Sequence, residues 1–136
     1  MKRLGRLVLI GVVAVIVVLG LGYVWGSSGR MQIQSTLDEV RQQLDLAEAR
    51  GELLDARVNL YNNNFGEASR HFEGAKEPLR RTRERYQEDG RDDAARSVAA
   101  ALEQVEEAQR LAGKLDPTAN AKAAEAMEAI RVATSR

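Results

Sequence analysis

Apolar residues follow two different patterns in the first half of the chain, and the first pattern is an unbroken run. From Leu7 to Trp25 almost every residue is apolar, and residues 7–29 contain no charged side chain. Nineteen residues in a helix extend for about 28 Å, which is close to the hydrocarbon thickness of a bilayer. The pattern predicts a transmembrane helix over residues 7–26, followed by a short linker at 27–30.

From Ile33 onward, apolar or small residues recur at gaps that alternate between four and three. This spacing predicts a helix of about 31 residues that carries a heptad seam. The residues of the seam are Ile33, Leu37, Val40, Leu44, Ala47, Gly51, Leu54, Val58 and Tyr61. Leu46, Leu53 and Leu60 form a second stripe beside it. The apolar face is therefore wider than a two-stranded coiled coil needs, which favours a bundle of several helices.

A turn is predicted where three asparagines and a glycine interrupt the helix, over residues 62–66. A second helix should run from about Gly66 to Glu88, with Ala68, Phe72, Ala75 and Leu79 facing inward. The four-three spacing continues past the turn, so one rod over residues 31–88 is the alternative. The turn residues would cost such a rod about 2 to 3 kcal/mol relative to alanines, which favours a helical hairpin.

Two further helices are predicted after Gly90, a residue well suited to follow a helix end. Asp92 should cap the third helix, and Asp116 and Pro117 should open the fourth. The residues predicted to face inward are Val98, Leu102, Val105, Ala108 or Ala112, and Leu115 on the third helix, and Ala119, Ala123, Met127 and Ile130 on the fourth. No segment has a strand pattern. We therefore expect an all-α protein, with an antiparallel bundle of about four helices over residues 31–136.

Basic residues on one side of the apolar run predict its orientation. Lys2, Arg3 and Arg6 precede the run, whereas Arg30 alone follows closely. The positive-inside rule then places residues 1–6 in the cytoplasm and the helical domain on the outer, periplasmic side of a bacterial inner membrane. A cleaved signal peptide is the alternative, but its apolar stretch is usually shorter, at about 7 to 15 residues. A retained single-pass signal anchor is therefore favoured.

Charge in the helical domain is nearly balanced. Residues 30–136 hold all 20 acidic residues and 17 of the 20 basic ones, which gives a formal charge of −3. A nucleic-acid partner usually requires a strongly basic surface, so none is predicted.

Candidate catalytic or metal-binding residues are few. His71 is the single histidine, and with Glu67 it would supply two ligands, whereas protein zinc sites use three or four. Pairing of His71 with a carboxylate on its own helix face is favoured instead. The chain has no cysteine, and no serine lies in a turn of the kind that presents a nucleophile. We therefore predict no enzyme activity, no metal and no cofactor.

Residues 63–75 carry a pattern of aromatic and small residues at helical spacing. Phe65, Glu67 and Ala68 lie at the predicted turn into the second helix, and Phe72 and Ala75 follow. This pattern resembles the second-helix half of a tetratricopeptide repeat, with the hairpin covering residues of about 52–80. The resemblance implies a helical hairpin whose partner helices must cover it, because a single repeat does not stand alone.

The same resemblance implies a binding groove on the first helix. Arg50, Leu53, Arg57 and Leu60 occupy places that line the concave surface in tetratricopeptide repeats, so they are the predicted partner-binding residues. The alternative is that the third and fourth helices cover the leucines.

A lipid-contacting end is predicted from the direction of the helices. Helices two and four should return toward the membrane, which would bring Arg81, Arg85 and Arg131 near the lipid headgroups. Anionic lipid attracts such residues by about 1 kcal/mol each. The alternative is pairing of these arginines with Glu77, Glu84 and Glu88.

Together these patterns predict a membrane-anchored extracytoplasmic interaction or scaffold module, an accessory subunit of an envelope protein complex. Its predicted partners are membrane lipid and a protein that the sequence does not identify. The alternative is a coiled-coil stalk or spacer that self-associates through the heptad seam, in which case a second copy of the chain is the partner.

Overall fold

The computed structural model describes residues 36–135 of the chain, which divides into two units, 1–40 and 41–136. The predicted basic N-terminus at 1–6, the transmembrane helix at 7–26 and the linker at 27–30 lie outside the described residues. Between residues 36 and 135, no helix is both long enough and apolar enough to cross a membrane.

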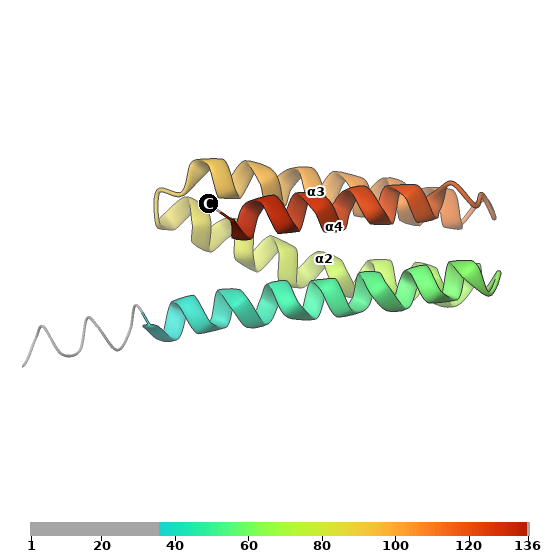
Figure 1. Cartoon of the computed structure of the whole chain (residues 1–136), viewed down its shortest axis with the longest axis horizontal. Helices are drawn as coiled ribbons and strands as arrows, with labels where there is room; N and C mark the ends of the chain where they lie inside the picture. The colour runs from blue at the N-terminus through green and yellow to red at the C-terminus, as the bar shows by residue number, and fades with distance from the viewer. Residues whose placement is uncertain (1–35, 136) are drawn as a thin grey trace, which may run out of the picture. The chain divides into compact units, whose positions relative to one another are not determined.

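Four helices make up the described residues, and no strand occurs among them. The first covers residues 36–61 and is followed by α2 (Phe65–Glu88), α3 (Asp92–Ala112) and α4 (Ala119–Thr134). Within residues 41–136, α3 packs against both α2 and α4 (Figure 1). Side chains of the first helix also bond to α2 and to α4. These contacts close a four-helix bundle and confirm the predicted all-α class for this part of the chain.

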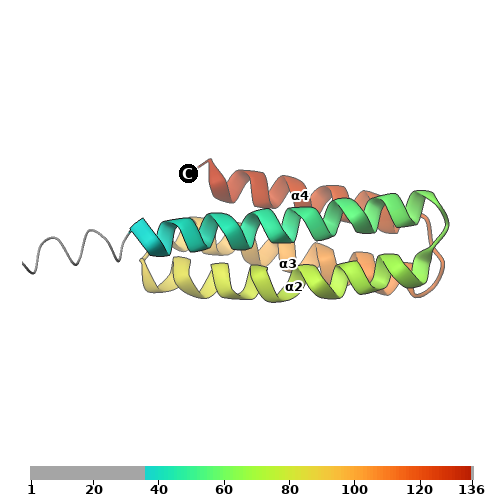
Figure 2. The same ribbon diagram turned by 90° about the horizontal axis from the view of Figure 1, so that it is seen from below.

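The first helix and α2 form the predicted hairpin (Figure 2). Glu52 bonds to His71 at 2.8 Å, and Asp45, farther from the turn, bonds to Arg81 at 2.8 Å. Contacts between residues at such different distances from the turn require the two helices to run antiparallel. The alternative of one continuous rod over residues 31–88 is therefore wrong.

Each turn between helices contains one residue with a left-handed backbone: Asn63 (φ 57°), Gly90 (φ 69°) and Leu115 (φ 58°). The amide of the following residue donates to a carbonyl five residues back, from Asn64 to Asn59, from Arg91 to Tyr86 and from Asp116 to Leu111. This is the Schellman arrangement, which satisfies carbonyl groups at a helix end. The predicted role of Gly90 is confirmed. Leu115, predicted to face the core, instead lies in the third turn and is exposed.

The predicted helix starts need small corrections. Asp92 is the first residue of α3 rather than its cap, and Arg91 precedes it. Asp116 accepts bonds from the amide of Thr118 at 2.9 Å and from its hydroxyl at 2.7 Å, so it caps a turn that leads into α4. Pro78 lies inside α2 without ending the helix.

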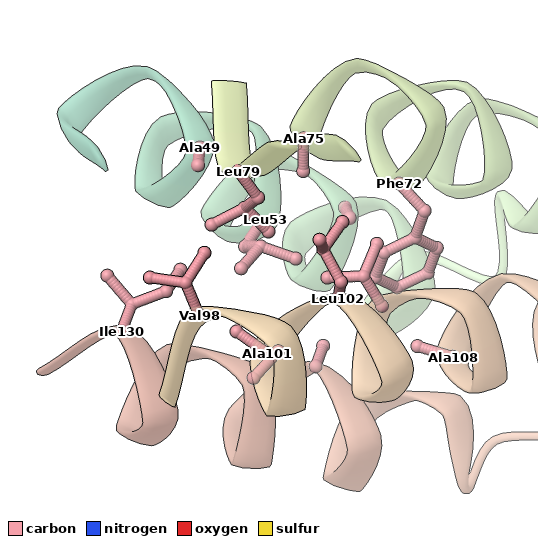
Figure 3. Close-up of a cluster of buried hydrophobic side chains, with 14 of the residues drawn as sticks. Ala49, Leu53, Phe72, Ala75, Leu79, Val98, Ala101, Leu102, Ala108 and Ile130 are labelled. Carbon is pink, nitrogen blue, oxygen red and sulfur yellow. The ribbon is translucent and has the colours of Figure 1, made fainter. Parts of the chain in front are cut away.

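The bundle core is rich in alanine, which makes up 13 of its 23 buried hydrophobic residues. Small side chains let helices approach closely, and a few large ones fill the remaining space. Figure 3 shows Leu53 of the first helix close to Leu79 of α2 and Val98 of α3. Ala68, Phe72, Ala75 and Leu79 are buried as predicted. The core is thus already filled by residues of this chain.

Candidate protein-interaction surface

The first helix exposes a row of large apolar side chains to solvent. Leu44 is 64% exposed, Leu54 49%, Val58 57% and Tyr61 86%. With the exposed small residues Ala47 and Gly51 they form what we call the outer stripe: Leu44, Ala47, Gly51, Leu54, Val58 and Tyr61. These residues are part of the heptad seam found in the sequence. Isolated exposed leucines are ordinary on protein surfaces, but a continuous apolar row is a feature of binding sites.

The opposite face of the helix enters the core through an inner stripe: Leu46, Ala49, Leu53, Ala56 and Leu60. It has the same alternation of three and four residues as the outer stripe, so spacing alone does not decide which stripe is buried. The inner stripe includes two alanines, and these match the alanine-rich faces of α2, α3 and α4.

This packing corrects the predicted groove. Leu53 is fully buried and Leu60 nearly so, and both belong to the hydrophobic core. They stabilise the bundle, and in this fold neither is open to a partner. The structure agrees with the alternative prediction, in which other helices cover the two leucines.

Arg50 and Arg57, the other two predicted binding residues, lie along one edge of the outer stripe. The Nη2 of Arg50 donates to the hydroxyl of Thr134 at 2.6 Å, and the Nε of Arg57 donates to Oδ1 of Asn120 at 2.8 Å. Both acceptors are neutral side chains of the α4 region, and no carboxylate among the described residues pairs with either arginine. Partner contact through Arg50 and Arg57 stays a prediction.

Acidic residues lie along the other edge of the outer stripe. Glu48 is 3.3 Å from Nη2 of Arg81. Asp55 is exposed, and its carboxylate has no ion-pair partner within residues 36–135. The outer stripe thus has a basic edge and an acidic edge. Among residues 36–135, Arg50, Arg57 and Asp55 have no ion-pair partner, whereas Glu48 pairs with Arg81.

A half-buried ion-pair cluster joins α2 to the first helix. Asp45 accepts hydrogen bonds from Arg81 at 2.8 and 3.2 Å and also from Arg85. Burial raises the pKa of Asp45, but the hydrogen bonds and charges of the two arginines outweigh it and hold the pKa below its ordinary value. Next to this cluster, Gln42 donates to Asp89 at 2.9 Å.

The cluster bears on the residues predicted to contact lipid. Arg81 and Arg85 bind the first helix through Asp45, and of the three predicted glutamate partners only Glu77 pairs with Arg81, at 3.8 Å. Arg131 pairs with Glu128 of its own helix at 2.8 Å. Contact of Arg81, Arg85 and Arg131 with lipid headgroups stays a prediction.

His71 pairs with the neighbouring helix rather than with its own. Its Nδ1 lies 2.8 Å from Oε2 of Glu52, whereas Glu67 pairs with Arg70 at 3.1 Å. Gly74 faces the same carboxylate so closely that an added Cβ would lie 2.9 Å from Glu52. Residues 36–135 contain no cluster of three or more side chains suited to hold a metal ion.

Comparisons with protein-family models, with curated proteins and with solved structures find no match to this chain. The resemblance of residues 52–80 to a tetratricopeptide repeat stays a prediction. The outer stripe is the candidate site because of its geometry alone.

Proposed function

We propose that this chain is a membrane-anchored helical interaction module that presents the outer stripe of its first helix to a protein partner. The apolar run over residues 7–26 supports the anchor, and the basic residues before it support an extracytoplasmic bundle. Such a module would serve as an accessory subunit of an envelope protein complex.

The observation that carries the proposal is the outer stripe. A helix that packs on one side of a bundle needs an apolar face only toward the core, and its other face is normally polar. Here the inner stripe fills the core, so the fold does not require Leu44, Leu54, Val58 and Tyr61 to be apolar. Contact with another protein gives these exposed side chains a role that the bundle does not.

A photo-reactive amino acid at Leu54 tests the proposal in the full chain in native membranes. We expect irradiation to yield a covalent adduct with a protein. The matched control is the same amino acid at Glu103, which is exposed on α3, and it should yield none. A second substitution, Val58→Asp, should abolish the adduct and leave the melting temperature of the dilute, unassociated protein unchanged. Absence of any protein adduct at Leu54 would refute the proposed function.

A further inference from the structure

We infer that the partner of the outer stripe is a second copy of this chain, aligned in parallel with the first. The inference rests on the proposed function, because it names the occupant of the same surface. Three observations support it: the spacing of the outer stripe, the sign of the charges on its two edges, and the lack of ion-pair partners for Arg50 and Asp55 among residues 36–135.

The outer stripe has the repeat of a two-stranded coiled coil. Leu44, Gly51 and Val58 take one core position of the heptad, called a, and Ala47, Leu54 and Tyr61 take the other, called d. A helix with this repeat packs best against a helix with the same repeat, because knobs and holes then coincide along the whole contact. A second copy of the chain meets this condition. In a parallel pair, each residue of the stripe faces its own counterpart.

The charges beside the stripe select the parallel orientation. Arg50 and Arg57 occupy heptad position g, which directly precedes position a. Glu48 and Asp55 occupy heptad position e, which directly follows position d. In a parallel pair, position g of one helix faces position e of the other helix, and that position e lies five residues farther along the sequence. Arg50 therefore lies opposite Asp55 of the second copy. An antiparallel pair would place g against g and e against e, so arginine would face arginine and carboxylate would face carboxylate. Such like-charge contacts disfavour that arrangement.

Arg50 and Asp55 are the residues that would pair across the contact, and neither has an ion-pair partner among residues 36–135; Arg57 would face Asn62. Arg50 and Arg57 bond to the neutral side chains Thr134 and Asn120, and Met127 lies 3.8 Å from Nη1 of Arg57. Asp55 has no cation beside it among residues 36–135. Exposed ion pairs contribute little affinity, so these charges act mainly on orientation, while the apolar stripe supplies the affinity.

Two further features agree with a parallel pair. The heptad spacing continues upstream in the sequence through Val40 and Leu37, and each is about half exposed. Two chains anchored through residues 7–26 would also leave one membrane in the same direction. Confinement in that membrane raises the effective concentration of one copy near another.

Cysteine crosslinking of the full chain in native membranes tests the inference, and the natural chain has no cysteine to interfere. Leu54→Cys and Val58→Cys should each give a disulfide-linked species of twice the monomer mass upon mild oxidation. Glu103→Cys on α3 is the matched control and should stay monomeric. Failure of both stripe variants to form this species would overturn the inference.

The orientation has a test of its own. Chains carrying Ala47→Cys are mixed with chains carrying Val58→Cys. In a parallel pair these two positions are separated by about 16 Å along the helix, which is too far for a disulfide. Same-site dimers should therefore exceed mixed dimers at least tenfold. A majority of mixed dimers would indicate an antiparallel pair and overturn the parallel assignment.

Charge reversal gives a second readout. Arg50→Glu alone and Asp55→Arg alone should each lower the Leu54→Cys dimer yield several-fold, and the double variant should restore it, because opposite charges then face each other again. Equal yields in all four chains would contradict the pairing. If the photo-reactive residue at Leu54 captures a different protein and never this chain, the inference falls while the proposed function stands; if it captures no protein, both fall.

Discussion

The adjacent leucines Leu53 and Leu54 offer a matched pair that measures which face of the first helix enters the core. Leu53 is fully buried, whereas Leu54 is about half exposed. Leu→Ala at either site changes helix propensity by the same small amount, so that contribution cancels in the comparison. The difference between the two variants then reports packing alone.

Leu53→Ala should lower the free energy of unfolding by about 2 to 5 kcal/mol. The substitution leaves a cavity beside Leu79 and Val98 (Figure 3), and large-to-small changes in a well-packed core cost this much. Leu54→Ala should cost about 0.75 to 1.5 kcal/mol at most, because full burial of a leucine side chain contributes about 1.5 to 3 kcal/mol and half of this one is already in water.

Urea unfolding of the full chain, followed by far-ultraviolet circular dichroism in a non-denaturing detergent, measures both values. The protein must be dilute, because self-association through Leu54 would add to its apparent stability. Equal slopes of free energy against urea are needed before the midpoints are compared. Equal losses for the two variants, or a larger loss for Leu54→Ala, would refute the assignment of the inner and outer stripes.

Four other predictions follow from single residues. Leu115→Gly should stabilise the chain by about 1 kcal/mol in thermal unfolding, because Leu115 has a left-handed backbone and a mostly exposed side chain. Thr82→Val should also stabilise it by about 1 kcal/mol, since the hydroxyl of Thr82 is buried and has no hydrogen-bond partner among residues 36–135; a loss would contradict this. Asp45→Asn should destabilise it by about 1 to 3 kcal/mol at pH 7. Because the folded pKa of Asp45 is lowered, its contribution is present above the unfolded pKa of about 3.9 and disappears as the pH falls through the folded value, so acid titration of stability should be shallower in the variant. A cysteine at Ser135 should react with a membrane-impermeant reagent in spheroplasts, and labelling that requires lysis would contradict the predicted topology.

The number of helices and the places where they end could be predicted from the sequence, because local chemistry determines them. Asn63 and Gly90 tolerate the left-handed backbone that each turn needs, and Asp116 caps the turn before α4. The prediction that Leu115 faces the core was wrong, because it too relied on the local sequence alone. Leucine disfavours the left-handed region, so nothing at that position signals a turn.

The choice of buried face could not be predicted, because it depends on the other helices. Both stripes of the first helix have heptad spacing. The outer stripe itself contains more large apolar residues than the inner stripe. In the structure, Ala49 and Ala56 lie inside, together with the alanine-rich faces of α2, α3 and α4. The link of Arg81 and Arg85 to Asp45 is also a consequence of this choice, since it depends on how the first helix is rotated about its axis.

A cysteine scan over residues 44–60 of the full chain tests directly whether protein covers the outer stripe in the membrane. The reaction rate of each thiol with a small soluble reagent is measured twice, in native membranes and in dilute detergent. Cysteines at Leu46 and Leu53 should react slowly in both conditions, because the bundle buries them. Cysteines at Leu44, Leu54 and Val58 should react fast in dilute detergent and at least tenfold more slowly in membranes. Equal rates for these three positions in the two conditions would contradict the account.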